Sequence, residues 1–270
     1  MTSPKTNLFA RIRRSAAKNR PSETPEPEDS RHRVPEGRRV YAIGDIHGRL
    51  DLLERLHAMI SEDSRNAASD AARVIVYLGD YIDRGPDSRA VIDLLRREDL
   101  PGFECVHLLG NHEWAMLEFL ENHLIGESWF AYGGYATLVS YGINPMPRPM
   151  PPEGRIAGLQ NALKAALPPE HFAFLMGLRL SHVEGDYLFV HAGIRPGVPL
   201  ERQEVEDLTQ IRYEFLESPL DHGKLVVHGH TIADEPEIRP NRIGIDTGAF
   251  ASGKLTCLVL EGSSRAFLTT

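Results

Sequence analysis

The chain has 270 residues, of which 41% are hydrophobic and 25% charged, a composition typical of a soluble globular protein with one sizeable core. No apolar run approaches the ~18 residues of a membrane-spanning helix, and the N-terminus lacks the apolar core of a secretory signal. Cys105 and Cys257 stand in apolar runs, which favours buried reduced thiols over a disulfide or a thiolate metal site. We therefore expect a cytoplasmic protein without stable membrane insertion.

The net charge of −8 divides unevenly along the chain. Residues 1–39 hold ten basic and five acidic residues, so this segment carries +5 and the remainder carries −13. An acidic body disfavours nucleic acid as a partner, because nucleic-acid binding depends on basic surface. It remains compatible with a small phosphorylated substrate, since bound metal ions can reverse the local field.

Residues 1–37 are polar and rich in proline, and we expect a basic, mostly disordered tail. Leu8, Phe9 and Ile12 beside three arginines leave open a short amphipathic turn that docks on a membrane surface or a partner. The rest, residues 38–270, is expected to form one folded domain.

Three strand–loop–helix units open this domain. Strands are expected at 39–43, 74–78 and 105–109, and helices at 50–62, 88–97 and 114–124. Polar residues follow each strand, which predicts adjacent, mostly parallel strands with their loops at one edge of a sheet.

Residues 126–180 have a different composition, with Gly133-Gly134 and five prolines between positions 145 and 152. We expect an insertion that packs over the rim of the site and selects the substrate. Four further strands are expected at 186–190, 224–227, 242–245 and 255–260. The short connection at 246–254 suggests that the later strands include antiparallel pairs.

Five strand exits carry residues that can bind metal ions or phosphate. They are Asp45 and His47; Asp80, Asp83 and Arg84; Asn111 and His112; His191; and His228 and His230. Carboxylate, imidazole and amide oxygen are ligands for Mn²⁺, Fe or Zn²⁺. The set exceeds what one ion needs, so we expect two ions that share a carboxylate, roughly 3.5–4 Å apart.

The exits read GDIHG (44–48), GDYIDRG (79–85), GNHE (110–113), HAG (191–193) and GHT (229–231), in that order. This series resembles the PPP family of metal-dependent serine/threonine phosphatases, within the calcineurin-like metallophosphoesterases. The Gly133-Gly134 region and IDTGA (245–249) are similar to its smaller bacterial and phage members. The resemblance covers roughly residues 39–262, and 145–180 fit it poorly. It implies an α/β fold in which two mixed sheets pack as a sandwich flanked by helices.

The resemblance also implies a ligand for each position of a two-metal site. The first ion would take Asp45, His47 and Asp80, and the second would take Asp80, Asn111, His191 and His230, with Asp80 as the bridge. The cofactors would be two divalent ions, with Mn²⁺ the first expectation and Fe or Zn²⁺ the alternatives. We place His228 outside the metal set, as a residue that supports it.

By the same resemblance, His112 is the general acid and Asp83 orients and charges its imidazole. Arg84, and less securely Arg212, would bind the phosphate. A hydroxide bridging the two metals would attack phosphorus directly, without a phosphoenzyme.

These residues predict a phosphomonoesterase that acts on phosphoserine and phosphothreonine in proteins. The main alternative is a symmetrical diadenosine tetraphosphatase, which shares most of the motifs; Asp83 and the GNHE form favour the protein phosphatase. A phosphodiesterase or nuclease fits the acidic body less well. A non-catalytic scaffold would have lost a ligand or the acid, whereas every motif position is filled here.

Overall fold

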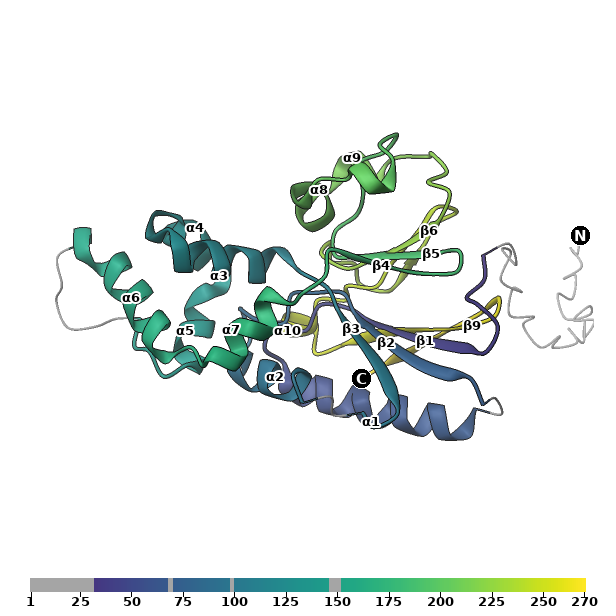
Figure 1. Cartoon of the computed structure of the whole chain (residues 1–270), viewed down its shortest axis with the longest axis horizontal. Coiled ribbons are helices and arrows are strands. Elements are labelled where there is room, and N and C mark those ends of the chain that lie inside the picture. The colour runs from purple at the N-terminus through teal and green to yellow at the C-terminus, as the bar shows by residue number, and fades with distance from the viewer. Residues whose placement is uncertain (1–31, 68–69, 98–99, 146–151) are drawn as a thin grey trace, which may run out of the picture.

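The computed structural model describes residues 32–67, 70–97, 100–145 and 152–270 (Figure 1). The predicted tail at 1–31, including its amphipathic turn, lies outside these residues. The described chain forms two five-stranded sheets that face each other, with helices on their outer sides and a group of helices beside one end. This is the predicted sandwich of two mixed sheets.

The first sheet has the strand order β10-β9-β1-β2-β3. Its strands are β1 (Arg38–Ile43), β2 (Ala72–Tyr77), β3 (Phe103–His107), β9 (Thr256–Glu261) and β10 (Ser264–Thr269). β1, β2 and β3 are parallel, whereas β9 pairs antiparallel with β1 and β10. The parallel strands are the three that the strand–loop–helix pattern predicts.

The second sheet has the order β4-β5-β6-β8-β7. Its strands are β4 (Ser181–Glu184), β5 (Tyr187–Val190), β6 (Leu225–His228), β7 (Glu237–Ile238) and β8 (Arg242–Gly244). β5, β6 and β8 are parallel, and β4 and β7 join them antiparallel. In each sheet, three neighbouring strands are thus parallel, and their carboxyl ends present loops at one edge.

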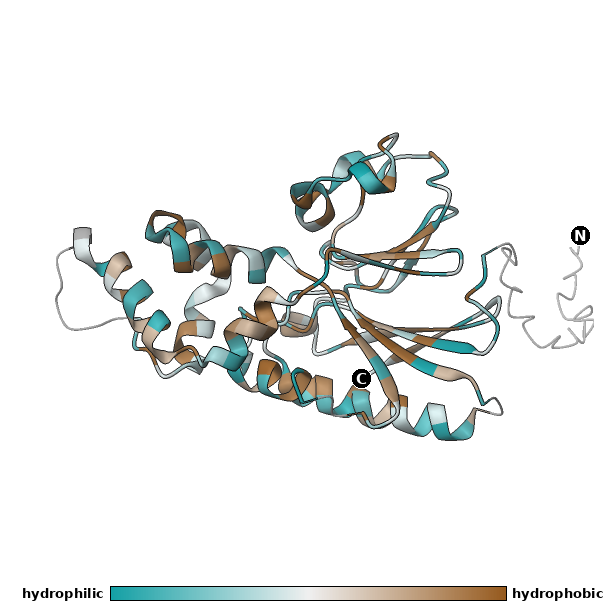
Figure 2. Ribbon diagram, in the orientation of Figure 1, coloured by the Kyte–Doolittle hydropathy of each residue, from teal (hydrophilic) through white to brown (hydrophobic). Residues whose placement is uncertain are grey.

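The core between the sheets explains why the central strands are apolar throughout. On β1, Val40 and Ala42 pack between the sheets, while Tyr41 and Ile43 belong to a second core on the helical side. All four side chains are fully buried. A strand covered on both faces needs apolar residues in succession rather than in alternation. Figure 2 shows hydrophobic stretches in the strands of the first sheet and also in the helices packed beside it.

Helices cover the outer face of each sheet (Figure 1). α1 (Leu50–Asn66) and α2 (Ser88–Leu95) lie along the first sheet, and α8 (Val205–Gln210) and α9 (Tyr213–Leu216) lie along the second. α1 is amphipathic, because Leu53, Leu56 and Ile60 recur at helical spacing and are fully buried. Among the described residues, no helix has the length and apolar character needed to cross a bilayer.

The remaining helices gather beside the ends of the sheets. They are α3 (Asn111–Glu121), α4 (Gly126–Trp129), α5 (Tyr135–Ser140), α6 (Pro152–Ala166), α7 (Pro169–Met176) and the short α10 (Ala249–Ser252). Single turns occur at η1 (His123–Ile125), η2 (Phe130–Gly134) and η3 (Leu200–Arg202). The insertion predicted at 126–180 supplies α4 to α7.

Two expectations differ from the structure. The folded part begins before residue 38, because Val34 is buried in the core between the sheets and its backbone N–H donates to Gly262. The connection at 246–254 does not close a hairpin, since it leaves β8 in the second sheet and enters β9 in the first. The later strands do include antiparallel pairs, as expected: β9 pairs with β1 and with β10, β4 with β5, and β7 with β8. β4, β7 and β10 themselves carried too few apolar residues to be predicted.

Core packing yields a matched pair of stability predictions. Leu260, on β9, is fully buried between the sheets, whereas Leu220, in a connection outside the helices and strands, is 50% exposed. Leu260→Ala should lower the free energy of unfolding by about 2–5 kcal/mol, because it removes buried methyl groups and leaves a cavity. Leu220→Ala should change it by less than about 0.5 kcal/mol. Urea denaturation measures both, and equal effects would contradict this description of the core.

Candidate active site

The loops that follow five parallel strands meet at one edge of the sandwich. Backbone hydrogen bonds join them: Ile46 and His47 donate to the carbonyl of Asp80 over 3.1 and 2.8 Å, and Gly229 donates to that of His191 over 2.8 Å. The first pair joins the exits of β1 and β2, and the last joins those of β5 and β6. Backbone hydrogen bonds therefore join neighbouring loops within each sheet into a framework for the site.

This framework is strained at its functional positions. In the described chain, the non-glycine residues with positive φ are His47, Asp80, Asp83, Arg84 and His230, with φ between 47° and 70°. Every one of them is a predicted site residue. Such backbone conformations cost on the order of 1–3 kcal/mol each and persist only where surrounding structure enforces them.

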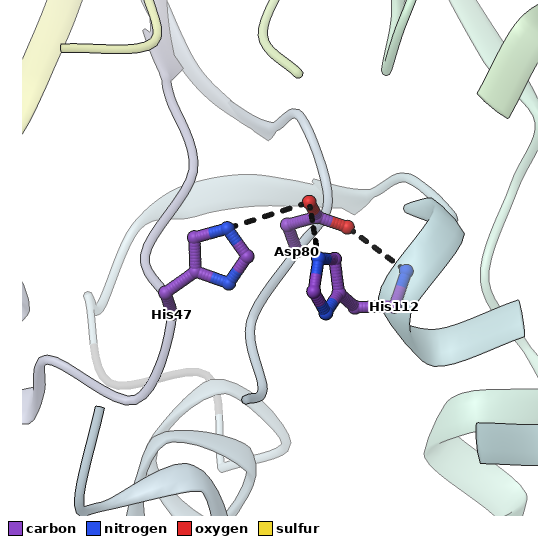
Figure 3. Close-up of side chains that lie close together, drawn as sticks. All are labelled: His47, Asp80 and His112. Atoms are coloured by element: carbon purple, nitrogen blue, oxygen red, sulfur yellow. Dashed lines mark hydrogen bonds and ion pairs between the residues drawn. The ribbon is translucent and has the colours of Figure 1, made fainter. Parts of the chain in front are cut away.

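Asp80 lies at the centre of the cluster. Its Oδ2 is 3.5 Å from Nε2 of His47 and 3.8 Å from Nε2 of His112, as Figure 3 shows, whereas its Oδ1 is 3.4 Å from Nε2 of His191. The two carboxylate oxygens thus face different histidines. This arrangement suits a carboxylate shared by two ions.

The other predicted ligands surround Asp80. Asp45 accepts hydrogen bonds from the backbone N–H of His230 at 3.0 and 3.2 Å, and Oδ1 of Asn111 is 3.0 Å from Nε2 of His191. A Cβ atom on Gly229 would overlap the Asp45 carboxylate, which explains the glycine between two histidines. His191 and His230 themselves lie in edge-to-face contact, with ring centroids 5.0 Å apart.

The histidines present the atoms that a metal ion needs. Nδ1 of His47 donates to the carbonyl of Ile82, and Nδ1 of His191 donates to that of Leu78, both over 2.9 Å. These bonds leave each Nε2 lone pair directed into the cluster. Nε2 of His230 is buried without a hydrogen-bond partner among the described residues. A buried nitrogen in that state fits a ligand whose ion completes it.

The charges of the cluster support the same conclusion. Burial, with Asp246 and Asp80 nearby, raises the pKa of Asp45 well above its usual value, and burial raises that of Asp246 to about 6. Burial lowers the pKa of His47 to about 3 and that of His230 to about 2, so both imidazoles are neutral, as metal ligands must be. Closely spaced carboxylates beside neutral imidazoles are suited to binding divalent cations.

His112 forms a buried pair with Asp83. Its Nδ1 lies 2.7 Å from Oδ2 of Asp83, and both side chains are at most 1% exposed. Burial by itself lowers the pKa of His112, but the charge of Asp80 and the hydrogen bond to Asp83 outweigh burial and raise it. Potential ligand atoms of His112, His47 and Asp80 also lie within 4.8 Å of one another, so these three side chains could bind one ion together. The geometry therefore admits His112 as an acid or as a ligand.

Two arginines border the cluster. Nη1 of Arg84 lies 3.0 Å from Nε2 of His47, and its Nη2 lies 3.2 Å from Nε2 of His112. Arg212 is exposed and donates to the hydroxyl of Thr231, and its charge helps to lower the pKa of His191 and His230. Arg84 thus contacts the cluster directly, whereas Arg212 is connected to it through the loop of Thr231 and through its charge.

His228 ends a strand of the second sheet and Arg195 follows one, but their side chains lie apart from the cluster. His228 is directed to the outer side of the second sheet, where it contacts Phe215 with ring centroids 5.2 Å apart and Nη1 of Arg242 at 3.4 Å. Arg195 forms two hydrogen bonds with the carboxylate of Asp207 at 2.6 and 2.8 Å. Among the described residues, no hydrogen bond joins either side chain to a predicted metal ligand, so the structure does not show the supporting role expected of His228.

The structure adds two residues whose site roles the sequence did not reveal. Glu113 accepts four backbone hydrogen bonds, from Gly110, Asp80, Tyr81 and Ile82, at 2.8–3.2 Å. Glu113 therefore caps α3 through Gly110 and also fixes the loop that carries Asp80. Phe250 packs beneath Arg84, 4.6 Å from the guanidinium carbon to the ring centroid. Its only sequence signal is its place directly after IDTGA.

Comparisons of the sequence place this site among known phosphoesterases. A family model described as calcineurin-like phosphoesterase matches residues 38–249. The asymmetrical bis(5′-nucleosyl)-tetraphosphatase PrpE of Oceanobacillus iheyensis is 28% identical and aligns with 81% of this chain and 87% of its own. Serine/threonine-protein phosphatase 2 of Escherichia coli is 27% identical, over 81% of this chain and 91% of its own.

Solved structures agree on the fold. A protein provisionally classed as a diadenosine tetraphosphatase superposes with a TM-score of 0.57 at 22% identity, covering 86% of this chain and 93% of that one. A cold-active protein tyrosine phosphatase from a Shewanella species gives 0.50 at 16% identity, covering 87% and 83%. The family match, the fold and the metal-binding geometry lead to one conclusion: the chain belongs to the calcineurin-like phosphoesterases, a family of metal-dependent hydrolases.

Proposed function

We propose that the protein is a two-metal phosphomonoesterase that removes phosphate from phosphoserine and phosphothreonine in proteins, with His112 as the general acid. The observation that carries this proposal is the buried hydrogen bond between Asp83 and Nδ1 of His112, which directs Nε2 toward the metal cluster. Serine and threonine leave as alkoxides, which are strong bases and need a proton as the P–O bond breaks. A nucleotide phosphate leaves as a stable anion and depends much less on an acid.

The remaining residues fit steps of such a hydrolysis. Two divalent cations, when bound, would lower the pKa of water and offset the charge of the phosphate. Asp45, His47, Asp80, Asn111, His191 and His230 are the residues that would hold them. Arg84 and Arg212 would orient the phosphate, since planar guanidinium groups match pairs of phosphate oxygens. His112 would then donate its proton to the departing oxygen.

A second candidate is the hydrolysis of dinucleoside tetraphosphates. Bis(5′-nucleosyl)-tetraphosphatases of both kinds are among the relatives, the asymmetrical form over 81% of this chain and the symmetrical form of Aromatoleum aromaticum over 58%, at 30% identity. The metal-binding residues suit either reaction, because both break a P–O bond next to bound cations. The substrates differ in the basicity of the leaving group and in the group attached to the phosphate, which is a polypeptide in one case and a nucleotide in the other.

A direct comparison of substrates separates these two candidates. Purified, Mn²⁺-loaded protein should hydrolyse phosphoserine and phosphothreonine peptides with a higher kcat/KM than diadenosine tetraphosphate. Release of inorganic phosphate measures the first reaction, and separation of the nucleotide products measures the second. A strong preference for the dinucleotide would replace the proposed function with the second candidate.

Asp80 offers a test of the shared carboxylate. Asp80→Asn should release at least one of two bound ions, because a neutral amide cannot serve both metals as a bridging anion. Asp93→Asn, a change of the same kind on α2 outside the cluster, should leave both ions in place. Elemental analysis of the purified chains gives the metal content, and an unchanged stoichiometry in Asp80→Asn would rule out the bridge.

His112→Asn tests whether this residue is an acid or a ligand. We expect both ions to stay bound while turnover of phosphothreonine peptides falls about 10²–10⁴-fold, because the alkoxide then leaves without a proton. Turnover of p-nitrophenyl phosphate should fall much less, since nitrophenolate is a weak base. A loss of metal, or equal losses on both substrates, would reject the role of general acid.

A further inference from the structure

Asp83 is held by more than its bond to His112. Its Oδ2 also accepts a hydrogen bond from the indole N–H of Trp129 at 2.8 Å, and its Oδ1 accepts one from the hydroxyl of Thr137 at 2.6 Å. Trp129 is 1% exposed, and Asp83 and Thr137 are fully buried. A carboxylate without access to water is stable only when such donors satisfy it. These two donors come from α4 and α5, in the insertion between the third and fourth strands.

Thr137 also fixes the backbone of Asp83. Its hydroxyl oxygen accepts from the backbone N–H of Asp83 at 3.0 Å and lies 2.9 Å from the hydroxyl of Ser88. A hydroxyl has a single proton to give. With that proton on the Asp83 carboxylate, Ser88 donates to Thr137 in turn. The network therefore holds both the carboxylate and the strained backbone of Asp83, where φ is 70°.

The same segment approaches Arg84. The carbonyl of Gly133 accepts from the backbone N–H of Arg84 at 3.3 Å. Gly133 has φ of 113°, and a Cβ atom there would lie 2.8 Å from Cγ of Arg84. Gly134 is in similarly close contact with the ring of Trp129. This accounts for the Gly133-Gly134 pair, whose role the sequence left unexplained.

We infer that Trp129 and Thr137 are positioning residues of the active site, which fix the Asp83 carboxylate and, through it, the imidazole of His112. The inference rests on the proposed role of His112 as general acid. Without the indole and hydroxyl donors, the carboxylate would be free to rotate, and the imidazole would lose the orientation that aims Nε2 at the leaving oxygen. The insertion therefore supports the site through buried contacts, in addition to the substrate selection that the sequence predicts for it.

The test uses three variants of the full chain. Thr137→Val removes the hydroxyl at nearly constant volume, Trp129→Phe removes the indole N–H, and Thr137→Ser retains the hydroxyl. We expect the first two to lower kcat on a phosphothreonine peptide about 10–100-fold, as is typical when a supporting hydrogen bond is lost. KM, bound Mn²⁺ and turnover of p-nitrophenyl phosphate should change little, and Thr137→Ser should retain most of the activity.

Matched controls come from elsewhere in the chain. Thr209→Val removes a buried hydroxyl that donates to the carbonyl of Val205 on α8, and Trp114→Phe changes an indole that has no bond to Asp83. Both should keep the wild-type kcat. In the His112→Asn background, Thr137→Val should cause no further loss, because its effect passes through the missing imidazole. Additive losses, or equal losses on both substrates, would overturn the inference.

A measurement without substrate separates this inference from the proposed function. The Nδ1 proton of His112, bound to Asp83, should give a downfield proton NMR signal in the Zn²⁺-loaded protein, assigned by its absence in His112→Asn. The signal should shift or disappear in Thr137→Val and Trp129→Phe and persist in the two controls. An unchanged signal would refute the positioning role, whatever the substrate. A signal that responds in a protein inactive on phosphopeptides would support it and reject only the proposed substrate.

Discussion

The site depends on the hydrogen bonds that the buried carboxylate of Glu113 accepts from two loops. This carboxylate accepts backbone N–H groups from Gly110 at the start of α3 and from Asp80, Tyr81 and Ile82 after β2. Burial and the nearby charge of Asp80 raise its pKa, to about 8, and the backbone donors oppose that rise. Glu113 thus joins two loops of the site and keeps Asp80 between its histidines.

Strain is the cost of this arrangement. Asp80, Asp83 and Arg84 adopt positive φ within a single loop. Glu113 holds the start of that loop, whereas the hydroxyls of Ser88 and Thr137 and the carbonyl of Gly133 hold its end. Elements distant in sequence therefore offset a local conformation that the loop would not adopt alone. Their rigidity matters for chemistry, because catalytic groups lose efficiency when their orientation is loose.

The chain's sequence was sufficient for much of the fold. Apolar runs and the polar residues that follow them predicted all three parallel strands of the first sheet, with helices α1 to α3. Strands at the outer edges were missed, because β4 and β10 are partly exposed and lack a continuous apolar run. The strands that pair with β8 and β9 could not be predicted either, because a connection of nine residues fits a hairpin as well as a crossing between sheets.

For the site, the sequence alone determined which residue types follow each strand, and hence a cluster of carboxylates, imidazoles and an amide at one edge. The tertiary structure decided the rest. It set the two Asp80 oxygens toward different histidines, turned His228 away, and brought Trp129 and Thr137 to Asp83 across 46 and 54 positions of sequence. The physical reason is that motif spacing fixes what each loop can offer, whereas hydrogen-bond partners between loops depend on how separate elements pack in space.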